Sequence, residues 1–371
     1  MEEKNILFSI IVPVYNTGKY VEKCLLSIKN AIDLDCEVII INDGSKDNSE
    51  EVIKKFIENL PTEYKDRFIY KYKENKGLAD TKNVGIELAR GKYISVIDSD
   101  DYITEDFYTI ARKYIEQDYD VIVYDLYIIY ENKKKKIEKG KAEDIIISNY
   151  VARAYREDKD NSITALLCGA MQGSSCNKII KKELYKPYKF PTNKEYEDTA
   201  VTPFIIVDAN KIKYIPYPLY YYLQREKSIV ATNTYISAFY KICENISNVL
   251  KQNGKYELYK EIINEFFVER ILETIYEDYK KNKKKFSKNI SEFSIKNKKT
   301  IEYILNSEMV FKEDNHYSPR QKSLTNLLFS NLLNENYKAV KKSFLSRRIV
   351  NYIRRCYRAM IVVLKTIIGR A

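Results

Sequence analysis

Residues 6–101 contain four short segments with the composition of β-strands, separated by longer segments with the pattern of helices. The first segment, Ile6–Val14, is almost entirely apolar and rich in β-branched residues, which is typical of a strand buried on both faces. Similar strands are predicted over Glu37–Ile41, Phe68–Lys73 and Tyr93–Ile97, with helices between them over Tyr20–Asn30, Glu50–Leu60 and Leu78–Ala89. This order predicts a doubly wound parallel sheet with right-handed crossovers.

Polar and charged residues occupy the turns after these four strands. They are Tyr15 and Asn16 in the first turn, Asp43 in the second, Lys76 and Gly77 in the third, and Asp98–Asp101 in the fourth. Ligands of open α/β sheets bind outside the carboxyl ends of the strands, so we expect these four turns to form one site.

The fourth turn carries three carboxylates within four positions, those of Asp98, Asp100 and Asp101. Anions placed so closely repel one another without a counter-charge, and carboxylate oxygens are hard ligands for Mg2+ or Mn2+. The spacing alone fits an Asp-rich turn that caps the next helix equally well. The neighbouring turns favour a metal site.

The later part of the chain predicts further sheet and then a helical region. Helices are predicted over Glu105–Gln117 and Ala200–Val207, strands over Val121–Tyr130, Ile212–Ile215 and Tyr220–Leu223, and a short strand or loop over Ser174–Ile180 before a helix at Lys181–Tyr185. From about 235 to 340 the pattern is helical, amphipathic and rich in lysine. We therefore predict an α/β fold with a doubly wound, mostly parallel sheet in residues 1–230, a helical domain in 231–346 and a C-terminal helix in 347–371.

The cysteine and histidine content narrows the chemistry. The six cysteines are scattered without a C-x-x-C pair, which indicates a reducing compartment and structural thiols. The single histidine, His316, lies in a polar stretch late in the chain, so neither a histidine-based catalytic triad nor a histidine-rich metal site is expected. Carboxylates, lysine, arginine or tyrosine must therefore carry the chemistry.

The net charge of +11 is unevenly distributed. Residues 1–120 hold 17 Lys and Arg against 24 Asp and Glu, and the remainder carries +18. An acidic first third argues against a nucleic-acid groove there. The chain shows no signal-peptide pattern and no apolar run near the ~20 residues of a membrane span, so we expect a cytoplasmic protein.

Residues 347–371 have helical spacing, with an apolar stripe from Ile349 to Ile367 and basic residues clustered away from it. This pattern predicts an interfacial helix on an anionic membrane, which would place the protein at the inner face of the cell membrane. The alternative is an ordinary helix that closes the C-terminal bundle with a solvated basic face.

Four motifs accompany the four strands in a particular order and spacing. They are Ser9–Asn16 (SIIVPVYN), Ile41–Ser45 (INDGS), Asn75–Ala79 (NKGLA) with Asn83–Gly85 (NVG), and Asp98–Asp101 (DSDD). Together they resemble the family-two inverting glycosyltransferases with the GT-A fold, of the type that builds bacterial surface polysaccharides such as capsules. The resemblance continues through Asn177-Lys178, Glu197-Asp198, Tyr222, Arg225 and Ser228, and it covers roughly residues 6–230, with a nucleotide-binding half in 1–104 and an acceptor half in 105–230.

The resemblance implies a role for each residue of a donor site. Tyr15 would stack on the nucleobase, Asp43 would accept a hydrogen bond from the base, a contact suited to uracil, and Asp98 would hold the ribose or the donor sugar. Asp100, with Asp101 nearby, would reach the divalent cation that bridges the diphosphate, and Arg225 would grip the diphosphate from the opposite side. The remaining donor-site residues would be Pro13, Asn16, Lys76, Gly77, Asn83, Ser99 and Ser228.

Inversion of the anomeric carbon needs a base on the face opposite the leaving group, and the resemblance implies Asp198 for this role. Glu197-Asp198 also fits a simple cap of the helix that follows. Asn177 and Lys178 either contact the acceptor or form a turn. Three positions depart from the family pattern, with Asn42 where Asp is frequent, Lys82 where Arg is frequent, and Cys176 where Trp is frequent.

The function expected on these grounds is the transfer of one sugar from a nucleoside diphosphate sugar, with UDP as the favoured nucleotide and Mn2+ or Mg2+ as the cofactor. The acceptor would be a hydroxyl of a cell-surface glycan or of a lipid-linked glycan. A nucleotidyltransferase and a non-catalytic GT-A module that docks to membrane or protein are the alternatives. Residues 231–346 would supply an acceptor platform, a homodimer interface, or both.

Overall fold

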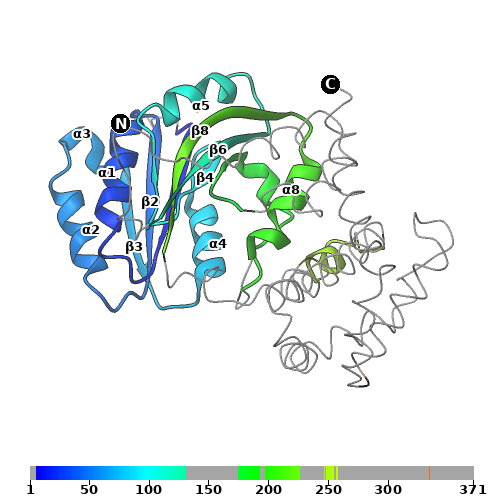
Figure 1. Cartoon of the computed structure of the whole chain (residues 1–371), viewed down its shortest axis with the longest axis horizontal. Coiled ribbons are helices and arrows are strands. Elements are labelled where there is room, and N and C mark those ends of the chain that lie inside the picture. The colour runs from blue at the N-terminus through cyan, green and yellow to red at the C-terminus, as the bar shows by residue number, and fades with distance from the viewer. Residues whose placement is uncertain are drawn as a thin grey trace, which may run out of the picture. The chain divides into compact units, whose positions relative to one another are not determined.

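The computed structural model describes residues 6–130, 174–192 and 197–225, together with 246, 248–254, 256–257 and 334 (Figure 1). The chain divides into two compact units, Met1–Thr232 and Asn233–Ala371. Ser228, the segment 347–371 and most of the predicted helical domain lie outside the described residues. None of the helices in the described part of the chain has the length and hydrophobicity of a membrane span.

The first unit is built on one sheet, whose strands lie in the order β3-β2-β1-β4-β7-β6-β8-β5. The strands are β1 (Phe8–Val14), β2 (Cys36–Asp43), β3 (Phe68–Lys73), β4 (Tyr93–Val96), β5 (Tyr102–Ile103), β6 (Val121–Tyr130), β7 (Lys178–Lys181) and β8 (Ile212–Gln224). β1 pairs in parallel with β2 and β4, β2 with β3, and β6 with β8. β7 is antiparallel to β4 and β6, and β5 is antiparallel to β8. The predicted α/β fold with a mostly parallel sheet is therefore confirmed.

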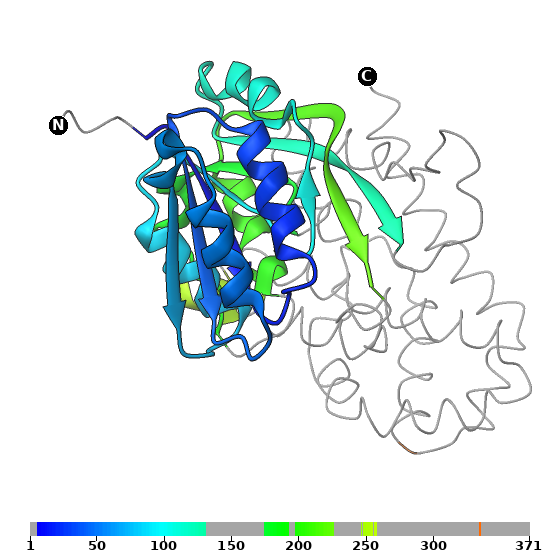
Figure 2. The same cartoon turned by 90° about the vertical axis from the view of Figure 1, so that its left-hand side faces the viewer.

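Helices cover both faces of the parallel half of the sheet. The helices are α1 (Val21–Ala31), α2 (Ser49–Glu58), α3 (Thr62–Lys65), α4 (Leu78–Leu88), α5 (Phe107–Ile115) and α8 (Thr202–Asp208), with 3-10 helices η1 (Lys182–Tyr185) and η2 (Glu197–Ala200). α1 and α2 lie on one face, and α4 lies on the other (Figures 1 and 2). β1 and β2 are buried along their whole length, as their β-branched composition predicts.

Two segments differ from the sequence-based prediction. The predicted helix at Lys181–Tyr185 is the 3-10 turn η1, preceded by the short strand β7. The two short strands predicted around Pro216 and Pro218 form one strand, β8. The pairing of β8 with β6 shifts register on both sides of Asp125, and such an irregularity accommodates prolines, which cannot donate a ladder hydrogen bond.

A buried carboxylate ties the central strands to the connection between α4 and β4. Glu37 of β2 is fully buried, and its Oε1 accepts hydrogen bonds from Ser9 Oγ (2.6 Å) and from the Arg90 backbone N–H (2.6 Å). The Arg90 side chain donates from Nε to Glu37 Oε2 at 2.8 Å. Gly91 N–H in turn donates to Ser9 Oγ at 2.8 Å. These contacts hold the entry to β4, the strand that ends in the acidic turn.

This arrangement predicts that Gly91 tolerates no side chain. A Cβ at Gly91 would lie 2.6 Å from the backbone nitrogen and the Oγ of Ser9 and 2.8 Å from the carbonyl carbon of Phe8. Because a buried central strand cannot move aside, Gly91→Ala should lower the free energy of unfolding by about 1–3 kcal/mol, measured by urea denaturation. Lys92→Ala, at the exposed neighbouring position, should change it by less than about 0.5 kcal/mol. Equal stability of the two variants would contradict this packing.

Candidate active site

The turn after β1 is bonded to the turns after β2 and β4. Asn16 has a left-handed backbone (φ 52°) that directs its Oδ1 to the backbone N–H of Lys46, at 2.7 Å, while its own N–H donates to Ser45 Oγ at 3.0 Å. The hydroxyl groups of Thr17 and Ser99 lie 2.9 Å apart. The structure therefore brings together the first, second and fourth turns, as expected for the carboxyl edge of a parallel sheet.

Asp43 connects the second turn to the third. Its carboxylate accepts hydrogen bonds from the backbone N–H of Lys76 at 3.0 Å and of Gly77 at 2.9 Å. Gly77 adopts a positive φ of 88°, which favours glycine. Lys73 Nζ also bonds to Asp43, its register partner in β2, and lies 2.8 Å from Asp80. The predicted base-binding residue is thus held rigidly, and Lys73 is a partner that the sequence analysis missed.

Tyr15 and Pro13 occupy the same edge of the sheet. The Tyr15 side chain is 46% exposed, although the strand before it is buried, and Pro13 belongs to that strand. A large ring left exposed beside a polar edge is available for stacking on a planar ligand.

The acidic turn after β4 is anchored to β8 through Asp101. Its Oδ2 accepts a hydrogen bond from the Tyr220 hydroxyl at 2.6 Å, and its Oδ1 accepts one from the Leu223 backbone N–H at 2.7 Å. Burial raises the pKa of Asp101 well above its usual range, and the neighbouring Asp98 and Asp100 add to this effect. Asp101 thus uses both oxygens within the protein, whereas the sequence analysis placed it beside a metal ion.

Asp100 pairs with Arg225 at the end of β8. The Arg225 Nη2 lies 2.5 Å from Asp100 Oδ2, and the guanidinium lies 5.3 Å from the centre of the Tyr20 ring. The Nε of Arg225 is buried and has no hydrogen-bond partner among the described residues. A buried donor of this kind fits an anionic oxygen supplied by a ligand.

A second acidic pair reaches the cluster through Lys82 of α4. The Lys82 ammonium is buried and donates to Glu197 Oε1 at 2.8 Å and to Asp198 Oδ1 at 2.5 Å. Burial alone would lower the pKa of Lys82, but Asp198, Glu197 and Asp98 outweigh burial and raise it well above the usual range. The sequence analysis noted Lys82 only as a departure from the family pattern. A lysine on the buried face of a helix is itself a signal that a carboxylate lies nearby.

Asp198 is oriented by Ser175 as well as by Lys82. The Ser175 backbone N–H donates to Asp198 Oδ2 at 3.0 Å, and the Ser175 hydroxyl lies 3.1 and 3.2 Å from the two carboxylate oxygens. The Asp198 side chain remains 20% exposed, so it can meet a ligand. Ser175 carries no sequence signal for this role.

Asp98 interacts electrostatically with charges of both acidic groups. Burial raises the pKa of Asp98 to about 7, with Lys82 opposing the increase and Asp100, Asp198 and Glu197 adding to it. Asp98 and Asp198, one hundred positions apart in the chain, therefore lie close enough to interact electrostatically.

Asn177, Lys178 and Asn83 make contacts within the protein. Asn177 Nδ2 donates to the Tyr124 carbonyl at 3.2 Å, and Asn177 Oδ1 accepts from Lys178 Nζ at 2.6 Å. Both side chains are buried, and burial lowers the pKa of Lys178 to about 8. The Asn83 amide bonds to both backbone polar groups of Phe190, each at 2.9 Å. These contacts position the segments that carry Ser175 and Lys82.

The residues of the acidic turn fit a divalent cation that is shared with a phosphate-bearing ligand. Within the described ranges, no group of three or more His, Cys, Asp or Glu side chains forms a ready-made ligand set. Mg2+ in phosphate-transfer sites usually takes only one or two carboxylates and receives its other oxygens from phosphates and water. Asp100, with Asp98 beside it, matches that smaller requirement.

Comparison with known proteins agrees with this architecture. Residues 9–182 match the model of the family described as glycosyl transferase family 2. The glycosyltransferase GlyG of Streptococcus pneumoniae serotype 4 is 32% identical over 233 residues, which cover 61% of this chain and 73% of GlyG. The minor teichoic acid biosynthesis protein GgaB of Bacillus subtilis is 26% identical over 242 residues, which cover 63% of this chain and 25% of GgaB.

A solved structure shares the fold. The crystal structure of S. aureus TarS 1–349 in complex with UDP-GlcNAc superposes with a TM-score of 0.57 at 19% sequence identity, and the match covers 92% of this chain and 91% of that one. This similarity, together with the curled, mostly parallel sheet, identifies the GT-A fold. The chain is therefore a glycosyltransferase that belongs to glycosyl transferase family 2.

Proposed function

We propose that the protein transfers one sugar from a UDP-sugar to a hydroxyl of a cell-surface glycan or of its lipid-linked precursor, with inversion at the anomeric carbon. The observation that carries this proposal is the proximity of two charged groups at the carboxyl edge of the sheet. One is the acidic turn with Arg225, and the other is the Lys82–Asp198 pair. The UDP-GlcNAc complex of TarS supports the donor class, and the name of GgaB supports a surface-polymer acceptor.

The donor would lie across the carboxyl edge of the parallel strands. The exposed Tyr15 ring would stack on the uracil, and the rigidly held Asp43 would accept a hydrogen bond from the base. Asp98 would hold hydroxyl groups of the ribose or the sugar. The unsatisfied Nε of Arg225 would donate to the diphosphate, since a guanidinium suits phosphate oxygens.

A cation at Asp100 would share the diphosphate with Arg225. When bound, Mn2+ or Mg2+ neutralises the negative charge that grows on the departing nucleoside diphosphate. Arg225 occupies Asp100 Oδ2 in the structure, at 2.5 Å, and would turn from this carboxylate to the phosphates as the donor enters. Asp101 would keep the turn attached to β8 through Tyr220 and Leu223 throughout.

Asp198 would act as the general base. Its carboxylate would take the proton of the acceptor hydroxyl while that oxygen forms a bond to the anomeric carbon. The bond from the anomeric carbon to the phosphate oxygen breaks on the opposite face, and its electron pair leaves with UDP, so the configuration inverts. Lys82 and Ser175 would hold the base in position. Membrane contact through 347–371 remains a prediction from the sequence.

Removal of the base tests the catalytic role. Asp198→Asn should lower kcat by about 10²- to 10⁴-fold, because the acceptor hydroxyl loses its proton acceptor, while UDP binding is retained. Transfer of labelled sugar from UDP-sugars in the presence of Mn2+ gives kcat, and titration with UDP gives the binding constant. Asp66→Asn, an exposed aspartate after α3, is the matched control. Unchanged kcat in Asp198→Asn would eliminate Asp198 as the base, and a product that keeps the donor's anomeric configuration would eliminate inversion.

A comparison of Asp100 with Asp101 separates metal binding from support of the turn. Asp100→Asn should weaken Mn2+-dependent UDP binding by at least about tenfold with little loss of stability, because it removes a charged ligand. Asp101→Asn should lower the free energy of unfolding by about 1–3 kcal/mol, because it alters a buried hydrogen-bond acceptor of Tyr220 and Leu223. Calorimetric titration of UDP with and without Mn2+, together with urea denaturation, measures both effects. If Asp101→Asn weakened UDP binding and Asp100→Asn lowered stability, Asp101 would be the metal ligand and Asp100 would support the turn.

Lys82 is expected to be indispensable as a counter-charge. Lys82→Met should lower the free energy of unfolding by about 3–5 kcal/mol, because the buried Glu197 and the partly buried Asp198 would remain without their cation. The double variant Lys82→Met/Glu197→Gln should recover part of this loss, measured as a coupling free energy in urea denaturation. Additive effects of the two substitutions would show that the ion pair does not exist.

A further inference from the structure

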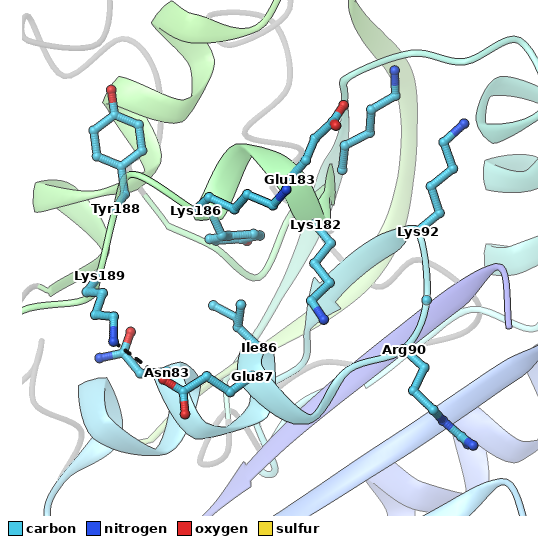
Figure 3. A pocket seen from close by; sticks show the side chains of 13 residues that line it. Asn83, Ile86, Glu87, Arg90, Lys92, Lys182, Glu183, Lys186, Tyr188 and Lys189 are labelled. Atoms are coloured by element: carbon cyan, nitrogen blue, oxygen red, sulfur yellow. Dashed lines mark hydrogen bonds and ion pairs between the residues drawn. The ribbon is translucent and has the colours of Figure 1, made fainter.

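A pocket of about 510 Å³ lies at the other end of β4 from the acidic turn (Figure 3). Arg90, Gly91 and Lys92, which line it, immediately precede β4, whereas Asp98–Asp101 follow that strand. Lys181, another lining residue, is the register partner of Tyr93 at the start of β4. A strand of four residues spans roughly 13 Å, so this pocket is separate from the proposed donor site.

The pocket lining carries a surplus of positive charge. Its basic residues are Arg90, Lys92, Lys181, Lys182, Lys186 and Lys189, against the acidic residues Glu87 and Glu183. Several of these cations are already neutralised. Arg90 pairs with Glu37, Lys92 and Lys181 pair with Asp118, and Lys189 lies 3.4 Å from Glu87.

Among the described residues, no carboxylate lies within ion-pair distance of the ammonium group of Lys182 or Lys186. Lys182 Nζ donates to the Ala89 carbonyl at 2.5 Å, which leaves its other N–H groups for a ligand. Both lysines belong to the η1 wall, and Figure 3 shows the Lys182 side chain extending toward α4.

The lining also includes less polar residues. Ile86 of α4, Tyr185 and Tyr188 line the pocket, and the Tyr188 hydroxyl donates to Asp208 Oδ2 at 2.5 Å, which fixes its ring. A volume of about 510 Å³ lies in the range of small-ligand sites, which combine apolar walls with a few convergent polar groups. The occupant must therefore offer an anion to the lysines and a carbon skeleton to the aromatic wall.

We propose that this pocket binds a phosphate ester of a sugar or polyol, with Lys182 and Lys186 as its phosphate ligands. Lysine binds phosphate as a compact point charge with three donors, and tyrosine rings pack well against the C–H faces of such ligands. A polyol phosphate occurs as a free monoester or, as a diester, in the headgroup of an anionic lipid. This proposal stands independently of the donor site, which lies at the opposite strand ends.

The pocket is placed to influence the active site through α4. Asn83 lines the pocket and clamps the backbone of Phe190, whose ring lies 5.4 Å from Lys82 Nζ. Lys82, the preceding residue of α4, holds Glu197 and Asp198. A ligand that packs against Ile86 and Asn83 would therefore contact the helix that supports the proposed base.

Calorimetric titration of the full chain, saturated with UDP and Mn2+ to occupy the donor site, tests the proposal with glycerol 3-phosphate, inorganic phosphate and glycerol as probes. We expect glycerol 3-phosphate to bind more tightly than phosphate, and glycerol not to bind. Lys182→Gln and Lys186→Glu should each weaken binding by about tenfold or more, because each removes a charged donor. Lys71→Glu, at an exposed position on β3, should leave binding unchanged. Circular dichroism verifies that each variant is folded.

Co-sedimentation with vesicles of phosphatidylglycerol or phosphatidylcholine distinguishes the two sources of the ester. Phosphatidylglycerol binding that is weakened by Lys186→Glu but not by Lys71→Glu assigns the pocket to a lipid headgroup. Glycerol 3-phosphate binding with no such vesicle effect assigns it to a free ester. The proposal is overturned if no phosphate probe binds, if Lys182→Gln and Lys186→Glu bind as the wild type does, or if Arg225→Ala abolishes binding, since that result would locate the ligand in the donor site.

Discussion

The buried ammonium of Lys82 is the interaction on which the active-site half of the protein depends. It lies between α4 and η2 and neutralises two carboxylates that burial would otherwise make costly. The same positive charge lowers the pKa of Asp98, against the larger effect of burial. Without this cation the acidic turn and the Glu197-Asp198 pair would repel each other, so a single charge allows two acidic groups from distant parts of the chain to lie near one another.

Hydrogen bonds between turns connect the turns around this charge. Asn16 bonds to the second turn, Asp43 to the third, and Asp101 to β8. Several side chains that belong to ligand-binding motifs therefore position the backbone. Asp100, Asp198, Arg225 and Tyr15 keep exposed surface toward a ligand, and a site preorganised in this way loses little entropy when the donor binds.

The parallel half of the sheet could be predicted from local sequence patterns. β3 has the predicted bounds, and β1, β2 and α4 differ from prediction only at their ends. For β1 and β2, which are buried along their whole length, apolar β-branched runs between turns leave few alternatives. η1 and β8 could not be predicted in this way. Their conformations depend on pairing with β4 and β6, and a proline-containing segment becomes a strand only when its partner accommodates the shift in register.

The sequence by itself determined the α/β alternation, the family and the turns in which the functional residues lie, because these follow from local periodicity and from spacing along the chain. Only the tertiary structure decided which carboxylates have partners. Asp101 is held by Tyr220 and Leu223, Lys82 meets Asp198 across more than one hundred residues, and lysines from separate segments line one pocket beside η1. Such contacts form where the fold brings distant segments of the chain together. The electrostatic energy between two charges depends on their distance in space, whatever their separation in sequence.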